Sequence, residues 1–183
     1  MSEAWRGTLL HAATSLALIA IVALVLRVRR LPAPEFLALR WPAARTVALW
    51  LAAFAVLVVV EEWASRVLGL PAPESWRDRY TGLVLVVRLI GLVVLAPVAE
   101  ELVFRGMLFG RIVRTRLGQP GAIIIPAVLF ALMHLQYSPL EMGFVAVDGL
   151  FFGLARAQSR SLYVPILLHA SGNAIAAAQR LLA

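Results

Sequence analysis

Long apolar segments dominate this chain and leave few ways for it to fold. They occupy residues 9–26, 47–60, 83–109, 122–135, 142–157 and 162–182. A helix needs about 20 apolar residues to cross the hydrocarbon core of a bilayer. Within lipid an open strand leaves its backbone groups unsatisfied, so we predict helices rather than strands. The expected fold is all-α, a polytopic bundle of about six transmembrane helices.

The composition agrees with a membrane protein. Hydrophobic residues make up 62% of the chain, whereas about 45–50% is usual in a soluble domain. The net charge is +7, but the basic residues, all of them arginine, separate the apolar segments and form no continuous basic face. We therefore expect membrane lipid as a partner and no nucleic acid. Cysteine is absent, which excludes disulfides, thiolate metal sites and cysteine nucleophiles.

The distribution of arginines predicts an orientation in the membrane. The first, third and fifth loops carry most of them, at Arg27, Arg29, Arg30, Arg40, Arg111, Arg114, Arg116, Arg156 and Arg160. By the positive-inside rule these loops face the cytoplasm and both termini lie outside. We expect a multi-pass protein of the bacterial inner (cytoplasmic) membrane. Its first apolar segment is predicted to be retained, because no small-residue cleavage site precedes the arginines that end it.

A few ionisable side chains lie inside the predicted helices, where they are costly and usually functional. Glu100, His134, His169 and the polar Asn173 lie about 12–20 Å from the cytoplasmic ends of three helices, counted at 1.5 Å per residue. Such a shared layer would form a polar reaction chamber. Asp148 falls at a similar depth, and we interpret it as lining this cavity rather than as catalytic.

The adjacent acids at positions 100 and 101 are predicted to have different environments. Glu101 and Arg105 are four residues apart, so they can pair on one face of a helix. Glu100 points about 100° away and remains free to face the chamber. A carboxylate beside imidazoles in a cavity of low dielectric is a general acid–base set.

The same spacing relates the other polar residues of the predicted chamber. His169 and Asn173 are four residues apart and would project together. Their N–H groups can stabilise an oxyanion. Phe130 stands one turn before His134 and would wall its ring.

Other notable positions have simpler interpretations. Gly149 and Gly153 predict close helix packing. His11 is interpreted as an interfacial residue near a helix end, and Glu61 and Glu62 as a solvated edge of the second apolar segment.

Three short motifs resemble those of one known family. The sequences EELVFRG at 100–106, FALMH at 130–134 and HASGN at 169–173 are similar to the EExxxR, FxxxH and HxxxN motifs of the CAAX protease and bacteriocin-processing family. The resemblance covers residues 83–183, the protease core, whereas 1–82 are predicted to be membrane helices without a recognised motif.

The resemblance implies an intramembrane endopeptidase that cleaves a membrane-associated, prenylated or C-terminally tagged protein or peptide. The resemblance also implies a catalytic or structural role for each residue that matches a motif position. Glu100 would activate water, His134 would orient that water or protonate the leaving amine, and His169 with Asn173 would bind the oxyanion. Glu101, Arg105 and Phe130 would support the site structurally.

Two alternatives remain open at this stage. Zn²⁺ could be held by Glu100, His134 and His169, although the chain has no HExxH motif. We favour a site without a cofactor, because Asn173 would be a poor zinc ligand but a good oxyanion donor. The second alternative is a non-enzymatic membrane scaffold or bacteriocin-immunity protein.

Overall fold

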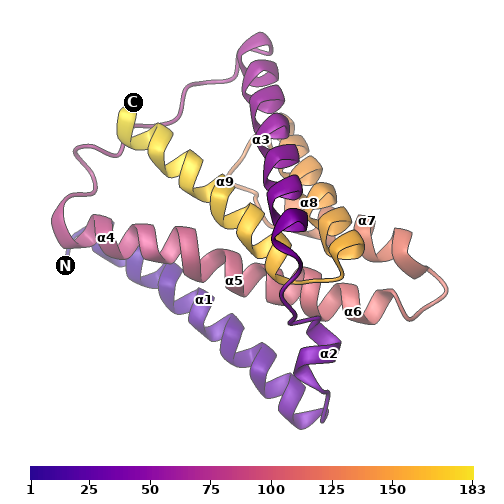
Figure 1. Cartoon of the computed structure of the whole chain (residues 1–183). Helices are drawn as coiled ribbons and strands as arrows, with labels where there is room; N and C mark the ends of the chain where they lie inside the picture. The colour runs from indigo at the N-terminus through magenta and orange to yellow at the C-terminus, as the bar shows by residue number, and fades with distance from the viewer.

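A computed structural model describes all of residues 1–183, and its regular structure is entirely helical (Figure 1). The helices are α1 (Glu3–Val28), α2 (Ala33–Leu37), α3 (Ala44–Val67), α4 (Gly82–Ile90), α5 (Ala96–Glu101), α6 (Phe109–Ile112), α7 (Gly118–Leu132), α8 (Pro139–Ser159) and α9 (Tyr163–Leu182), with π-helical segments η1 (Gly91–Leu95) and η2 (Leu102–Leu108). The prediction of an all-α fold is confirmed. Every predicted apolar segment is helical over most of its length.

Three helical segments are long and apolar enough to cross a membrane, namely Glu3–Val28, Ala44–Val67 and Gly82–Ile112. Their outer faces leave side chains such as Leu24, Val59 and Val94 exposed, which suits contact with lipid. The protein is therefore an integral membrane protein. Helix α7 is apolar but shorter, at 15 residues, and the predicted number of about six membrane helices is not established.

The segment Gly82–Ile112 is one continuous helix, but it is not uniformly α-helical as predicted. It contains the two π-helical segments η1 and η2. Pro97 follows η1 closely. Because proline has no N–H, it cannot donate a hydrogen bond to the carbonyl one turn earlier, and its ring crowds that turn. The acidic pair Glu100 and Glu101 lies between the two π-helical segments. Such segments occur frequently at functional sites.

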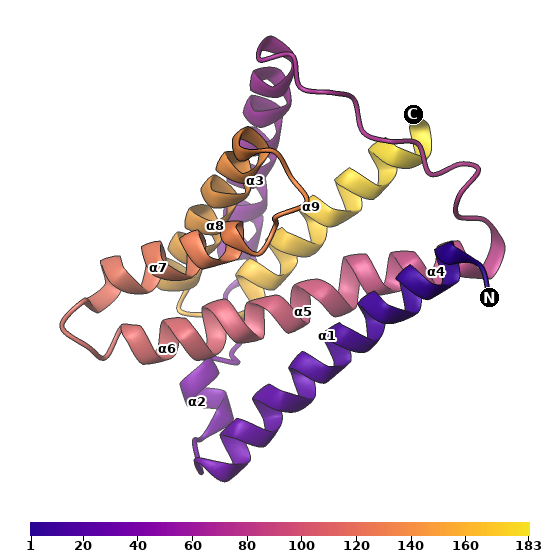
Figure 2. The ribbon, with the colours of Figure 1, turned by 180° about the vertical axis from the view of Figure 1, so that it is seen from behind.

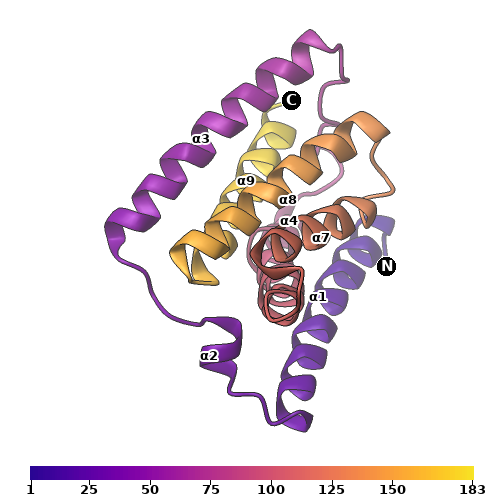
Figure 3. The same ribbon diagram turned by 90° about the vertical axis from the view of Figure 1, so that its right-hand side faces the viewer.

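The central helix Gly82–Ile112 separates two groups of helices (Figure 3). Helix α1 runs along one side of it and contacts α4, η1, α5 and η2. Helices α8 and α9 lie on the other side, and α3 covers them through a buried cluster of Phe54, Phe152, Ala155, Val164 and Leu168. The motif-bearing helices thus meet in the middle of the molecule.

Helices α7 and α8 pack closely, as the two glycines predict. A Cβ atom on Gly149 would lie 3.0 Å from the Cα of Ala127, and one on Gly153 would lie 3.1 Å from the Cγ2 of Ile123. Only residues without a side chain allow the backbones to approach this far. This contact fixes the distance between α8 and α7, which carries most of the second motif.

The arginine-bearing loops gather at one end of the molecule. The guanidinium of Arg40 donates from Nε to the carbonyl of Arg160 across 2.8 Å, and the Ser161 hydroxyl donates to the carbonyl of Arg40 across 2.7 Å. The two termini lie away from this end (Figure 2). At the opposite end, near the C-terminus, the N–H of Trp76 donates to the carbonyl of Arg180. We call the end that holds α2 and these loops the arginine end.

Candidate active site

A buried ion pair connects two residues of the first motif, Glu101 and Arg105. The Arg105 Nη1 lies 2.8 Å from Oε1 of Glu101, and both side chains are fully buried. The predicted pair is therefore present, and it closes one helical turn. The other terminal nitrogen of Arg105 donates to the carbonyl of Gly149 across 2.7 Å. Aromatic rings of Phe104, Phe130 and Phe152 surround the guanidinium, with centroids 5.0–5.9 Å from its central carbon.

His169 lies between the two glutamates of the first motif. Its Nδ1 is 3.1 Å from Oε1 of Glu101, and its Nε2 is 3.7 Å from Oε2 of Glu100. The paired Glu101 carboxylate accepts, so Nδ1 carries the proton and Nε2 faces Glu100. Phe152 stacks on the imidazole and Phe130 meets it edge-on, each with centroids 5.5 Å apart. Rigid neighbours thus fix the orientation of the ring.

Glu100 is the less constrained acid of the pair. Its side chain is 26% exposed and makes no contact with an arginine. It lines a pocket of about 150 Å³ against α1, together with His11, Thr14 and Ser15. His11 was expected near a helix end, but α1 begins at Glu3 and His11 lies more than two turns inside it. The ring faces this pocket, and its Nε2 is buried without a hydrogen-bond partner.

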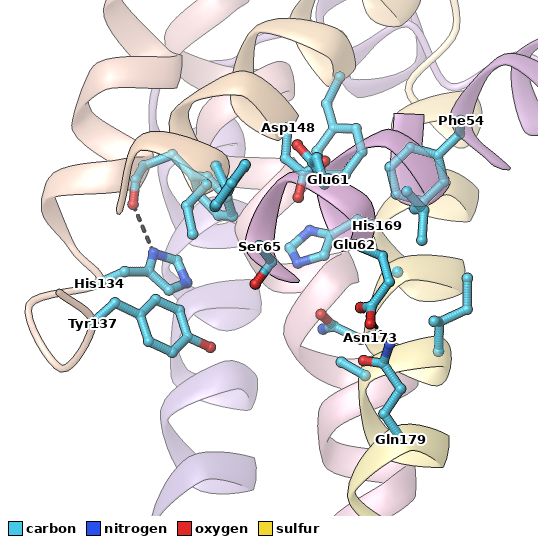
Figure 4. A pocket seen from close by; sticks show the side chains of 18 residues that line it. Phe54, Glu61, Glu62, Ser65, His134, Tyr137, Asp148, His169, Asn173 and Gln179 are labelled. Carbon is cyan, nitrogen blue, oxygen red and sulfur yellow. Dashed lines mark hydrogen bonds between the residues drawn. The ribbon is translucent and has the colours of Figure 1, made fainter. Parts of the chain in front are cut away.

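A second cavity, of about 300 Å³, lies between α3, α8, α9 and the end of α7 (Figure 4). We call it the central cavity. Four of the predicted site residues line it, as does Phe130: His134, Asp148, His169 and Asn173. Glu100 lines the neighbouring α1 pocket instead and reaches His169 from there. The structure thus brings the three motifs together, but not around a single chamber.

His134 lies outside the helix on which it was predicted. Helix α7 ends at Leu132, and His134 follows in the turn that leads to α8. Its Nδ1 donates to the carbonyl of Phe130 across 2.8 Å, which leaves Nε2 available. The ring stacks on Tyr137 and meets Phe130 edge-on, so the expected wall is present. His134 forms no ion pair with Glu100.

Asn173 is anchored by the irregular part of the central helix. Its side-chain amide donates to the carbonyl of Leu92 across 2.8 Å. In a π-helical turn that carbonyl would accept from the residue five positions later, as the carbonyl of Gly91 does from Ala96. For Leu92 that residue is Pro97, which has no N–H. Asn173 therefore supplies the donor that the proline lacks, and its amide keeps a second N–H.

Helix α3 contributes an acidic residue that sequence reasoning missed. Glu61 lines the central cavity, and its Oε1 is buried without a partner, as is Oδ1 of Asp148. Interpreting Glu61 as a solvated edge is therefore wrong. Glu62 is 42% exposed and pairs with Arg66 at 2.8 Å. The spacing of residues along α3 could have placed Glu61 in the cavity. One face of this helix lines the cavity, and that face carries Phe54, Val58, Glu61 and Ser65.

The side chains proposed as zinc ligands do not converge. No three His, Asp or Glu side chains lie close enough together to hold a metal ion. His169 directs both ring nitrogens at carboxylates, and Nδ1 of His134 is used by a backbone carbonyl. The residues present therefore do not fit a three-ligand zinc site.

Comparison with known proteins identifies one related family. The family described as Type II CAAX prenyl endopeptidase Rce1-like matches residues 82–175, just over half of the chain. The match includes all three motifs. No curated protein and no solved structure matches the chain.

Proposed function

Because the chain belongs to the Rce1-like family of type II CAAX prenyl endopeptidases, we propose that it is a glutamate-dependent intramembrane endopeptidase. The family relationship supports a CAAX-type endopeptidase that acts on a protein or peptide in a membrane. The assignment of Glu100 as the general base rests on one observation. Of the two adjacent glutamates, only Glu100 is free of Arg105, and its carboxylate lies 3.7 Å from Nε2 of His169.

In the proposed reaction Glu100 takes a proton from water while the water oxygen attacks the carbonyl carbon of the scissile bond. The resulting tetrahedral intermediate carries an oxyanion. The C–N bond then breaks, and its nitrogen must receive a proton to leave as an amine. His134 is suited to orient the water or to protonate this amine, because its Nε2 is not used within the protein.

His169 and Asn173 are proposed to bind the oxyanion. A protonated His169 has a second N–H at Nε2, and the Asn173 amide has one N–H beyond that given to Leu92. Glu101 and Arg105 act as positioning residues, since the carboxylate that accepts from Arg105 also holds Nδ1 of His169. A fixed second partner of this kind sets the tautomer and direction of an imidazole.

The alternatives offered by the sequence have less support. A zinc-dependent mechanism on Glu100, His134 and His169 would require these side chains to converge, which they do not. A scaffold or immunity protein would have no need for a glutamate kept free beside a buried imidazole. Such a protein would keep its function when Glu100 is replaced.

The proposed substrate is a class of membrane-associated proteins or peptides rather than one molecule. A prenylated CAAX protein, another membrane-associated protein and a C-terminally tagged peptide all fit an active site enclosed by membrane helices. We further propose the bacterial cytoplasmic membrane as the location, with the arginine end facing the cytoplasm.

The proposal is tested with the full-length protein reconstituted in liposomes. Farnesylated CAAX peptides and the same peptides without the lipid are offered, and cleavage is followed by mass spectrometry. In parallel, membrane peptides are compared between cells that express the wild type and cells that express Glu100→Gln. We expect at least one peptide to accumulate uncleaved with the variant. Identical peptide profiles, together with no cleavage in liposomes, would reject protease activity.

A further inference from the structure

An apolar groove opens at the arginine end, apart from the central cavity. It lies between the end of α1, α2 and the η2–α6 part of the central helix, and its volume is about 320 Å³. That size is sufficient for a small-molecule ligand, for which about 300–1,000 Å³ is typical. Its apolar walls are formed by Val25, Leu31, Phe36, Val103, Met107 and Leu108.

Two arginines also line this groove. Arg29 is the C-cap residue of α1 and Arg111 lies in α6, so the two cations come from elements far apart in the sequence. Both side chains are exposed, and neither forms an ion pair. No carboxylate lines the groove. Its chemistry therefore complements a ligand with an apolar chain and an anionic head.

The position of the groove favours a lipid as that ligand. Four of its six apolar wall residues belong to two segments that are long and apolar enough to cross the membrane, Glu3–Val28 and Gly82–Ile112. Its arginines belong to the end predicted to face the cytoplasm, where anionic phospholipids are concentrated. Basic pockets between membrane helices on that side bind phospholipid head groups.

We propose that the groove binds an anionic phospholipid, with one acyl chain against the apolar wall and the phosphate between Arg29 and Arg111. Guanidinium groups bind phosphate oxygens through paired, charge-assisted hydrogen bonds. The lipid would contact both α1 and the central helix, since Val25 of α1 and Met107 of η2 both line the groove. Binding should therefore stabilise the association of these two segments.

The test measures lipid retention by the purified full-length protein. Phosphatidylglycerol and phosphatidylcholine with the same acyl chains are offered in equal amounts, and bound lipid is counted by native mass spectrometry. We expect one tightly held phosphatidylglycerol. The double variant Arg29→Gln/Arg111→Gln should lose about 30-fold in affinity, which corresponds to about 1 kcal/mol per arginine. Leu108→Trp, which narrows the apolar part, should lower the affinity without changing the charge.

The matched control removes the same charge from the same end. Arg27 and Arg116 are exposed and unpaired, but they do not line the groove. The variant Arg27→Gln/Arg116→Gln should retain phosphatidylglycerol to within a few-fold. An equal loss in this control, or equal retention of both lipids by the wild type, would reject the site. Displacement of the lipid by a farnesylated peptide would assign the groove to substrate and also overturn the proposal. None of these outcomes depends on proteolytic activity.

Discussion

Nδ1 of His169 lies 3.1 Å from Oε1 of Glu101. The same carboxylate oxygen accepts from Arg105 at 2.8 Å, so the imidazole is tied to a buried ion pair. Its other nitrogen faces Glu100 at 3.7 Å. Two glutamates adjacent in the sequence therefore contact opposite nitrogens of one ring. This arrangement separates a carboxylate held in a buried ion pair from one that is free of arginine, and the proposed mechanism depends on that difference.

The first prediction is that Glu100→Gln nearly abolishes peptide cleavage while the protein stays folded and membrane-inserted. The amide has almost the shape of the carboxylate but cannot take a proton from water. Cleavage rates of wild type and variant in liposomes measure the effect. Glu74→Gln is the matched control, because Glu74 is exposed and makes only a long contact of 3.8 Å with Arg79. More than a tenth of wild-type activity in Glu100→Gln would contradict its role as general base.

The second prediction compares two arginines that each pair with a glutamate four residues earlier. Arg105→Ala should lower stability by about 3–5 kcal/mol, since it leaves Glu101 charged and buried. Arg66→Ala should cost about 0–1 kcal/mol, because Arg66 is 77% exposed and its partner Glu62 is 42% exposed. Thermal unfolding in detergent measures both. Unchanged unfolding with loss of activity in Arg105→Ala would place Arg105 in the chemistry instead.

The third prediction uses two glycines of α8. A Cβ at Gly149 would lie 3.0 Å from the Cα of Ala127, so Gly149→Ala should destabilise the protein by about 1–3 kcal/mol through overpacking. Gly143 has open space around it, so Gly143→Ala should stabilise the helix by up to about 1 kcal/mol. The two melting temperatures should move in opposite directions. A rise in both melting temperatures would show that helix propensity, and not the contact between α7 and α8, decides both. A fall in both would contradict the open space at Gly143.

The fourth prediction concerns the turn that carries His134. Ser138 caps α8: its hydroxyl accepts from the N–H of Glu141, and the Glu141 carboxylate accepts from the hydroxyl and N–H of Ser138. Ser138→Ala should cost about 1 kcal/mol and should also slow cleavage, because the cap fixes the turn beside His134. Ser2→Ala, which removes the N-cap of α1, is the control for a cap far from that turn. It should cost stability without slowing cleavage.

The cap also has a defined pH dependence. The hydrogen bonds from Ser138 lower the pKa of Glu141 below its ordinary value of 4.5. A carboxylate with a lowered pKa contributes stability above the unfolded pKa and loses it as pH falls through the folded pKa. The difference in melting temperature between wild type and Ser138→Ala should therefore be full near neutral pH and shrink in acid. A constant difference would show that the Glu141 carboxylate takes no part in the cap.

The fifth prediction concerns zinc. We expect the purified enzyme to stay active after exhaustive treatment with a strong zinc chelator, because Glu100, His134 and His169 do not converge on one point. Elemental analysis of the purified protein should find no stoichiometric zinc. Zinc at one ion per chain, with activity lost on removal and restored on return, would assign a metalloprotease to the same residues.

The local sequence was sufficient for the features that depend on neighbouring residues. The spacing of Glu101 and Arg105 predicts their ion pair. Gly149 and Gly153 predict close helix packing, and the structure shows that the partner is α7. These predictions rest on the geometry of a regular helix, which brings residues four apart onto one face. The three motifs likewise indicate the family without any knowledge of the fold.

The same reasoning failed where the helix is irregular or where distant elements meet. Counting along a regular helix placed His134 inside α7, which instead ends at Leu132. The contact of Asn173 with Leu92 depends on a π-helical turn before Pro97. Nothing local to either residue specifies this contact.

The sequence by itself determined an all-helical membrane protein, its family and the residue types of its candidate site, because periodicity, apolar length and motif spacing are properties of short segments. Only the tertiary structure decided which glutamate faces which nitrogen of His169. It also decided that Glu100 lines the pocket against α1 rather than the central cavity, and that Glu61 lines the central cavity. The physical reason is that these relations join α1, α3, the central helix and α9. The packing of whole helices sets them, and no spacing along the chain encodes that packing.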